Sequence, residues 1–174
     1  MKLLLLILLL LFININININ NSNDINYCAC SGFLLPKQQY IPLYKDTNCS
    51  DISCYVINDT ISEDYFVFKI LQTVENYAFI SGGYIISDTT IINGWIELKY
   101  ITTNLVIEDS IPLYSNHSKK SAIQSHINYP YWQPVKIIKC YKNWLFIEYT
   151  DKYQKKSGWL SNEYNCSNPY TTCN

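Results

Sequence analysis

The sequence predicts an all-β protein, and three observations favour this class. Aromatic residues make up 15% of the 174-residue chain, with 16 Tyr, 4 Trp and 6 Phe, and Ile and Val dominate the other apolar positions; these residue types favour strands. Good helix formers such as Ala and Met are rare, and Leu is concentrated in the first eleven residues. Short alternating runs, such as the one that places Phe66, Phe68 and Ile70 on one side, are typical of half-buried strands.

Residues 1–22 are expected to be a secretory signal peptide followed by a low-complexity tract. Lys2 precedes an apolar run of eleven residues that ends at Ile13. This run is too short to span a bilayer, which needs about 20 residues, but it fits the apolar core of a signal peptide. The alternating Ile and Asn residues that follow, to Asn20, are a dipeptide repeat to which we assign no structure. We therefore expect a secreted or periplasmic protein without a membrane span, which begins with an N-terminal segment, 23–37.

The charge of the chain argues against nucleic-acid binding. The sequence has 13 Lys, no Arg and 14 acidic residues, a formal net charge of −1. A nucleic-acid-binding protein normally carries a basic face, usually with Arg.

Four short motifs occur twice, in the same order, and divide the rest of the chain into two units. The distance between the two copies falls from 70 to 64 residues along the chain, as expected when loops vary in length while strands are kept. The pairs are IPLY (41–44 and 111–114), FKIL with VKII (68–71 and 135–138), NYAFI with NWLFI (76–80 and 143–147), and GWIELKY with GWLSNEY (94–100 and 158–164). We predict unit 1 over 38–103 and unit 2 over 107–165.

Each unit has the same predicted order of elements. A short extended segment ending in Tyr is followed by a long polar loop, two apolar strands joined by a tight turn, and a strand that begins with Gly-Trp. With about 60 residues of short strands per unit, closure into a small barrel is the economical solution, because closure removes exposed strand edges.

These motifs resemble bacterial SH3-like domains, which are small barrels of five or six strands found in exported envelope proteins. The resemblance rests on the opening that ends in Tyr, the hairpin that carries NW, and the closing Gly-Trp strand. The end of the chain, GWLSNEYNCSNPYTTC, is also similar to the ends of small exported bacterial proteins with such domains. The resemblance implies two tandem SH3-like β-barrels and a ligand in the cell wall. Unit 1 departs from the pattern by an insertion before Gly94, and neither unit has an Asn-Val-Arg segment after its opening loop.

Seven cysteines predict disulfide bonds in an exported protein. We favour two local bridges, Cys49 with Cys54 and Cys166 with Cys173. The second bridge would staple the C-terminal tail, 166–174, around a Pro turn.

The other three cysteines leave alternatives open. Cys140 lies in a predicted hairpin turn and is the candidate for an unpaired thiol. Cys28 and Cys30 pair with partners elsewhere, or one of them ties the N-terminal segment to unit 2 or to a second chain. Their spacing matches no zinc pattern, and a redox Cys-x-x-Cys motif is missing. We therefore predict no metal and no cofactor.

The sequence does not predict an enzyme. The available histidines are His117 and His126, both in the opening loop of unit 2, where we expect them to be exposed. A Cys-His peptidase needs its groups packed on a scaffold, and no segment resembles the papain-like domain that often accompanies bacterial SH3-like modules. A hydrolase that uses Cys140 or Cys28 with His126 stays a minor hypothesis, and it requires a free thiol of low pKa.

A stiff aromatic loop is the main candidate for ligand binding. In the segment NYPYWQP, 128–134, two prolines hold Tyr129, Tyr131 and Trp132 near the start of a strand. Exposed aromatic rings on such a loop suit a peptide or glycan, although the same rings could plug a barrel end or the contact between units. Tyr114 and Trp144 complete the candidate ligand-binding set.

Two further tryptophans, Trp95 and Trp159, head the Gly-Trp strands, and we expect them to pack in the core. The sequence thus predicts a non-catalytic exported binding module that recognises cell-wall peptide or glycan, or an envelope protein. The alternative is a protein inhibitor or immunity-type partner of an exported enzyme.

Overall fold

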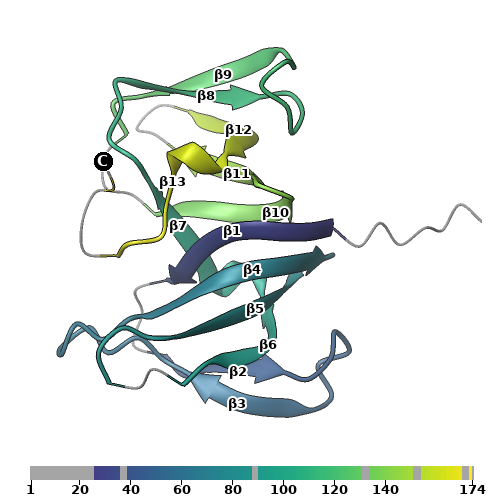
Figure 1. The fold of residues 1–174 in the computed structure, drawn as a ribbon, viewed down its shortest axis with the longest axis vertical. Coiled ribbons are helices and arrows are strands. Elements are labelled where there is room, and N and C mark those ends of the chain that lie inside the picture. Colours follow the sequence, from purple (N-terminus) through teal and green to yellow (C-terminus); the bar gives the residue numbers. More distant parts are fainter. Residues whose placement is uncertain are drawn as a thin grey trace, which may run out of the picture.

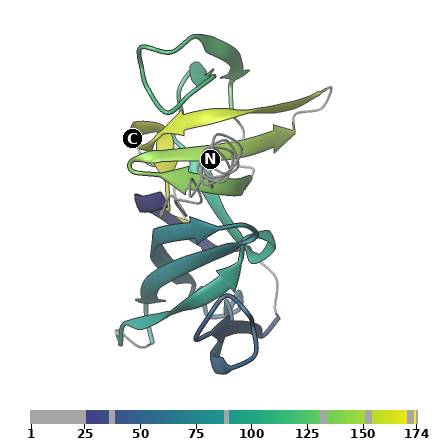
Figure 2. The ribbon, with the colours of Figure 1, turned by 90° about the vertical axis from the view of Figure 1, so that its right-hand side faces the viewer.

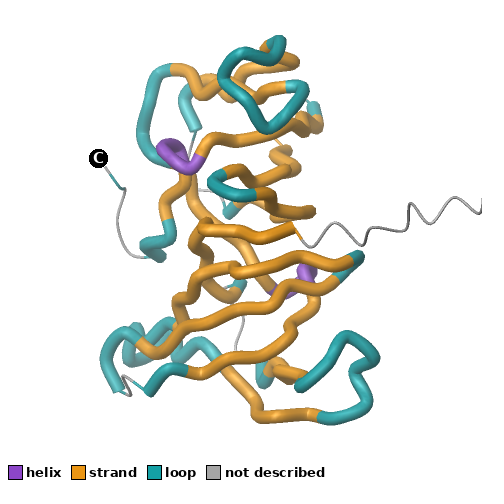
Figure 3. The backbone as a smooth tube through the Cα atoms, turned by 45° about the vertical axis from the view of Figure 1, so that its right-hand side comes forward, coloured by secondary structure: helices purple, strands orange, loops and turns teal. Residues whose placement is uncertain are grey.

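The computed structural model describes residues 26–35, 39–87, 90–130, 134–150, 154–169 and 173, and within them it confirms the all-β class. The predicted signal peptide lies outside the described residues. The elements are β1 (Asn26–Leu34), β2 (Ile41–Tyr44), β3 (Ile52–Val56), β4 (Phe66–Val74), β5 (Tyr77–Tyr84), β6 (Ile92–Glu97), the 3₁₀ turn η1 (Leu98–Tyr100), β7 (Ile101–Leu105), β8 (Ser110–Tyr114), β9 (Ile123–Asn128), β10 (Val135–Tyr141), β11 (Trp144–Thr150), β12 (Lys155–Ser161), the 3₁₀ turn η2 (Asn162–Tyr164) and β13 (Asn165–Cys166). Figure 3 shows how little of the chain is helical. No helix in these ranges is long and apolar enough to cross a membrane.

The strands form one open antiparallel sheet in the order β3-β2-β6-β5-β4-β1-β7-β10-β11-β12-β8-β9, and β13 pairs with β7. β1 and β7 lie in the middle of the molecule, with the strands of unit 1 on one side and those of unit 2 on the other (Figure 1). The view turned by 90° shows the same division (Figure 2).

The repeated motifs lie on corresponding strands of the two units. The Tyr that ends IPLY pairs with the Trp of the Gly-Trp strand in both, as Tyr44 with Trp95 and as Tyr114 with Trp159. From each edge of the sheet inward, the order of strands is the same. The edge hairpin (β3–β2 or β9–β8) comes first, the Gly-Trp strand (β6 or β12) comes second, and the two strands of the apolar hairpin (β5–β4 or β11–β10) follow.

A close approach of two strands explains the Gly that precedes each of these tryptophans. A Cβ atom on Gly94 would stand 3.0 Å from the Cβ of Leu43, and one on Gly158 would stand 2.8 Å from the Cβ of Leu113. Because such contacts are tighter than Cβ atoms normally make, β2 and β8 can cross their partners this closely only over glycine.

Strand β7 joins the two units by pairing with three other strands. Thr102 lies opposite Phe33 of β1, and Thr103 lies opposite Val135 of β10. Both threonines are buried, and their hydroxyls are satisfied: Thr102 Oγ1 donates to the Val135 carbonyl at 2.8 Å, and Thr103 Oγ1 donates to the Cys166 carbonyl at 2.9 Å. The apolar core is accordingly one continuous cluster that runs through both units.

Two buried polar residues organise the long loops of unit 1. The Asn58 side chain donates to the Leu34 carbonyl at 2.9 Å and accepts from the Phe66 amide at 3.0 Å. The Asp64 carboxylate accepts from the backbone amides of Ile86 and Ser87 at 2.9 and 3.1 Å. Each loop is therefore tied to the end of a neighbouring strand.

The structure contains two disulfides, one between distant parts of the chain and one within the C-terminal tail. Cys166 is bonded to Cys173, which confirms the predicted staple of the tail. Cys28 is bonded to Cys140, and this bridge ties the N-terminal segment to unit 2. The expectation that Cys140 is unpaired was wrong. Cys140 lies inside β10, where it is fully buried opposite Leu145. Backbone hydrogen bonds with Lys142 hold the start of β1, and with it Cys28, beside Cys140.

The predicted Cys49–Cys54 bridge was also wrong, since both residues are free thiols. Cys54 lies opposite the buried Leu43 and packs against the core. Cys49 has a positive φ of 58° in the loop, where its thiol donates to the Thr47 carbonyl at 3.6 Å and hydrogen-bonds with Tyr77. Cys54 thus packs toward the core, whereas Cys49 is held in the loop by Thr47 and Tyr77. The third free thiol, Cys30, is fully buried, and burial raises its pKa to about 12.

Candidate ligand-binding face

The outer face of unit 2 gathers aromatic side chains from four strands and a loop. On β11, Leu145 and Ile147 are fully buried in the core, so Trp144 and Phe146, which alternate with them, lie on the opposite face. The strand register extends this face across the sheet, because Phe146 lies opposite Trp159, and Trp159 lies opposite Tyr114. We call this set the unit 2 aromatic face: Tyr114, His117, Tyr141, Trp144, Phe146 and Trp159.

The rings of this face contact one another edge to face. The ring centroids of Tyr114 and Trp144 lie 5.4 Å apart at an interplanar angle of 89°. Those of Phe146 and Trp159 lie 5.5 Å apart at 70°. Such pairs contribute about 0.5–1.5 kcal/mol beyond the burial of their surface, and they hold the rings in fixed orientations before any ligand arrives.

His117 covers part of this face. Its ring lies 4.2 Å from the Tyr141 ring and 5.3 Å from the Trp159 ring, measured between centroids. The expectation that His117 is exposed was wrong, because these ring contacts leave its side chain half-buried. The other histidine, His126, is exposed as predicted.

Lysines surround the aromatic rings. The Lys139 ammonium lies 5.3 Å from the ring centroids of both Phe146 and Trp159, and the Lys142 ammonium lies 5.3 Å from that of Tyr141. A cation over a ring face is attracted by the ring quadrupole. Unit 2 as a whole has eight lysines and five acidic residues, a formal charge of +3, whereas unit 1 has three lysines and eight acidic residues, a charge of −5. The aromatic face of unit 2 is therefore flanked by lysines and belongs to the positively charged unit.

The structure brings together only part of the predicted ligand-binding set. Tyr114 and Trp144 are in contact. Tyr129 is 67% exposed and follows the end of β9 that pairs with the start of β8. Four residues of β8 separate that point from Tyr114, or roughly 13 Å at about 3.3 Å per residue. Tyr131 and Trp132 lie outside the described residues.

The prediction that Trp95 and Trp159 pack in the core is confirmed for the burial of Trp159 and wrong for Trp95. Each alternates with core residues and lies on the outer face, where Trp95 contacts Phe79 at 5.3 Å and Trp159 contacts Phe146. Trp159 is nevertheless only 8% exposed, because side chains of the outer face, His117 among them, cover it. Trp95 is half-buried.

Unit 1 carries a counterpart of this face without the cations. Tyr77 and Phe79 take the positions of Trp144 and Phe146, and Gln72 lies opposite Phe79 where Lys139 lies opposite Phe146. A hydrogen bond with the Cys49 side chain raises the pKa of Tyr77 to about 12. The two faces thus share their aromatic positions and differ in charge.

Sequence reasoning missed Tyr141, Phe146 and Lys139. The sequence pattern that could have identified Phe146 is the alternation in NWLFI, which places Phe146 on the same side of the strand as Trp144. The register of the hairpin then places Tyr141 and Lys139 opposite these two residues.

A metal site and the proposed hydrolase each require particular groups among the described residues. Within the described ranges, no group of three or more His, Cys, Asp and Glu side chains could hold a metal ion. The hydrolase hypothesis requires a free thiol at Cys140 or Cys28. These two cysteines are bonded to each other in a disulfide.

No protein-family model, curated protein or solved structure is significantly similar to this chain. Its function is therefore argued from its own residues and geometry.

Proposed function

We propose that the chain is an exported, non-catalytic binding protein made of two tandem SH3-like units. The order of elements supports this proposal. In each unit, a first strand leads into a hairpin, a three-stranded meander, a 3₁₀ turn and a final strand that pairs with the first one. These are β1, β2–β3, β4–β5–β6, η1 and β7 in the first case, and β7, β8–β9, β10–β11–β12, η2 and β13 in the second. The strand β7 then serves both units.

The two disulfides support export. Disulfides persist in oxidising compartments and are rare in the cytosol, and the Cys28–Cys140 bridge closes a segment of 112 residues. An export signal at 1–22 and a secreted or periplasmic location are part of the same proposal.

The ligand in this proposal is cell-wall peptide or glycan, or an envelope protein that presents similar groups, and it binds to the unit 2 aromatic face. The observation that carries the proposal is the preformed contact of Tyr114 with Trp144, beside rings that Lys139 and Lys142 approach. Aromatic faces stack on sugar rings and on prolines, and the lysines favour the carboxylates of wall peptides. Rigid aromatic side chains of this kind usually provide most of the binding energy at an interface.

Retention of the purified, oxidised protein on peptidoglycan sacculi at low salt tests the proposal. We expect Trp144→Ala to weaken retention about tenfold, as for an aromatic residue worth roughly 1.4 kcal/mol. Tyr77→Ala, at the corresponding position of unit 1, is the matched control and should bind like the unchanged protein. Circular dichroism of both variants checks that the fold is intact.

Three results would contradict the proposal. If the unchanged protein is not retained on sacculi, the wall is not the ligand. A single stoichiometric protein partner in crosslinking, without affinity for wall material, would select the inhibitor or immunity function instead. Equal losses for Trp144→Ala and Tyr77→Ala would show that the unit 2 face has no special role.

A further inference from the structure

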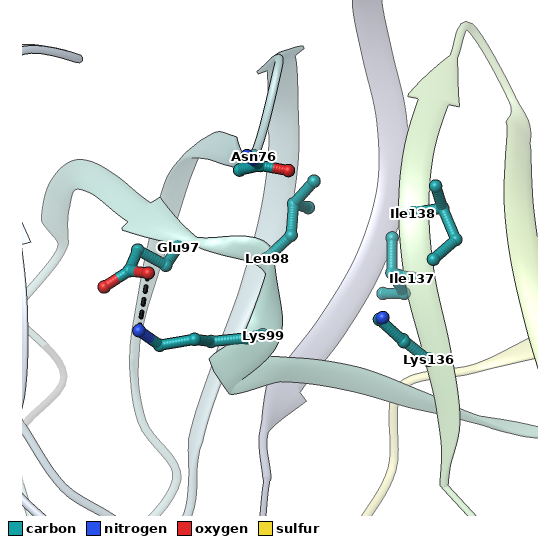
Figure 4. Close-up of a pocket in the computed structure, with 7 residues that line it drawn as sticks. All are labelled: Asn76, Glu97, Leu98, Lys99, Lys136, Ile137 and Ile138. Carbon is teal, nitrogen blue, oxygen red and sulfur yellow. Dashed lines mark ion pairs between the residues drawn. The ribbon is translucent and has the colours of Figure 1, made fainter.

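A cleft of about 440 Å³ lies where the two units meet. One wall comes from η1 and the β4–β5 turn of unit 1, and the other comes from the first half of β10 in unit 2 (Figure 4). None of its lining residues belongs to the unit 2 aromatic face: they are Asn76, Glu97, Leu98, Lys99, Lys136, Ile137 and Ile138. The cleft is thus a separate candidate site.

The inner walls of the cleft are apolar. Leu98 and Ile137 are buried, and Ile138 is half-buried. The backbone amide of Leu98 donates to the Asn76 carbonyl at 2.8 Å, which fixes η1 against the β4–β5 turn. The register of β10 against β11 shifts between Ile137 and Lys139, so that Ile138 has no direct partner in the ladder. Bulges of this kind re-aim side chains and often lie beside binding sites.

The charges on the two walls differ. On the unit 1 wall, Lys99 Nζ lies 2.6 Å from Glu97 Oε2, and this hydrogen bond raises the pKa of Lys99. The two charges of that wall therefore neutralise each other.

On the unit 2 wall, Lys136 extends from β10 toward η1 (Figure 4), and among the described residues no carboxylate lies within ion-pair distance of it. Glu148, which is opposite Lys136 in the ladder, pairs with Lys155 at 2.6 Å instead. One uncompensated positive charge therefore stands at the edge of an apolar cleft.

We propose that this cleft binds the C-terminal carboxylate of a peptide that ends in a branched apolar residue. The carboxylate pairs with the Lys136 ammonium, the apolar side chain packs between Leu98 and Ile138, and the last peptide group hydrogen-bonds with the exposed Asn76. A cleft of this volume falls at the small end of ligand pockets, which measure roughly 300–1,000 Å³ and often lie between domains. This would be a second ligand site, independent of the aromatic face.

A titration followed by ¹⁵N nuclear magnetic resonance tests the proposal with N-acetyl-leucine as the probe. Its matched control is N-acetyl-leucine amide, which has the same shape but no charge. For a ligand of this size we expect saturable shifts of the Leu98 and Ile137 amides with a dissociation constant on the order of a few millimolar. The amide should bind at least tenfold more weakly.

Lys136→Gln keeps the length of the side chain and removes its charge. We expect this variant to lose at least tenfold in affinity for N-acetyl-leucine, while Lys120→Gln, an exposed lysine of the β8–β9 loop, should leave the affinity unchanged. The unperturbed part of each spectrum reports whether the variant is folded.

Equal binding of the acid and the amide would overturn the proposal, as would shifts that map elsewhere or that survive Lys136→Gln. The proposal would also be overturned if no amide signal shifted at an N-acetyl-leucine concentration 20-fold above the expected dissociation constant. Retention on sacculi and its loss in Trp144→Ala are measured separately, so either function can fail while the other stands.

Discussion

Asp64 is a buried carboxylate that holds two loops of unit 1 together. It is 5% exposed, and it accepts hydrogen bonds from the amides of Ile86 and Ser87. Burial raises the pKa of this carboxyl group, but the hydrogen bonds from Ser87 and Ile86 lower it by more, so that the pKa lies below the ordinary value of 3.8. The folded protein therefore favours the charged form.

This shift predicts how the stability of the protein depends on pH. Because the pKa of Asp64 is lower in the folded than in the unfolded chain, its contribution is fully present above about pH 4 and is lost as the pH falls through the folded-state pKa. We expect Asp64→Asn to lower the free energy of unfolding by about 1–3 kcal/mol at pH 7, and the difference should shrink as the pH falls through the folded-state pKa. Urea unfolding at pH 7, 5 and 3 measures it.

Asp109→Asn is the control, since this carboxylate is exposed. A loss of stability in Asp64→Asn that stays the same at all three pH values would contradict the assigned role of the charge.

The cysteines offer a second prediction at the scale of single residues. Alkylation without reduction should modify two thiols in the folded protein, Cys49 and Cys54, which are both half-buried. It should modify three after denaturation, when the fully buried Cys30 with its pKa of about 12 becomes accessible. Mass spectrometry counts both. A single thiol after denaturation would mean that Cys49 and Cys54 are bonded after all.

At the scale of the elements, the two disulfides differ in how much of the chain they enclose. Their cysteines are separated by 112 residues for Cys28–Cys140 and by 7 for Cys166–Cys173. In the chain-entropy model, the longer loop contributes about 5 kcal/mol and the shorter one about 2 kcal/mol.

We therefore expect the double variant Cys28→Ser, Cys140→Ser to lose more than twice the unfolding free energy that Cys166→Ser, Cys173→Ser loses. Denaturant titration of both variants beside the unchanged protein measures this. Equal losses would mean that the long bridge is not a restraint on the unfolded chain.

Local patterns predicted the hairpins well and the long-range pairs poorly. The alternation in β4 and β10 and the Gly-Trp strands appear where the motifs place them. No strand was predicted at β1, which lies in the N-terminal segment 23–37, because its partners β4 and β7 lie far along the chain. For the same reason the Cys28–Cys140 pair could not be derived from spacing. Cys49 and Cys54 are close in sequence, but spacing alone does not reveal that Cys54 packs against the core while Cys49 contacts Thr47 and Tyr77.

The candidate site shows the same limit. Tyr114 and Trp144 were predicted because they belong to repeated motifs, and strand register brings them together. The position of His117 depends on how the β8–β9 loop folds over the sheet, which no local pattern encodes. The cleft between the units was also beyond sequence reasoning, because η1 leads into β7, and the long-range pairing of β7 with β10 brings the two walls together.

At the scale of the whole molecule, β7 fixes how the two units face each other. It pairs with β1 on one side and with β10 on the other, so that no linker separates the units. The unit 2 aromatic face and its counterpart in unit 1 therefore keep a constant relative orientation. A protein built this way presents two different surfaces as one rigid body.

The Cys28–Cys140 bridge also determines how the molecule transmits mechanical force. If its two ends are pulled apart, tension passes from Cys28 directly to Cys140 through the sulfur atoms and bypasses the chain between them, whose sequence separation is 112. About 380 Å of contour length, at roughly 3.4 Å per residue, is thereby removed from any extension. All of unit 1 lies within this shielded loop, so only the strands after Cys140 can unravel under load while the bridge is intact.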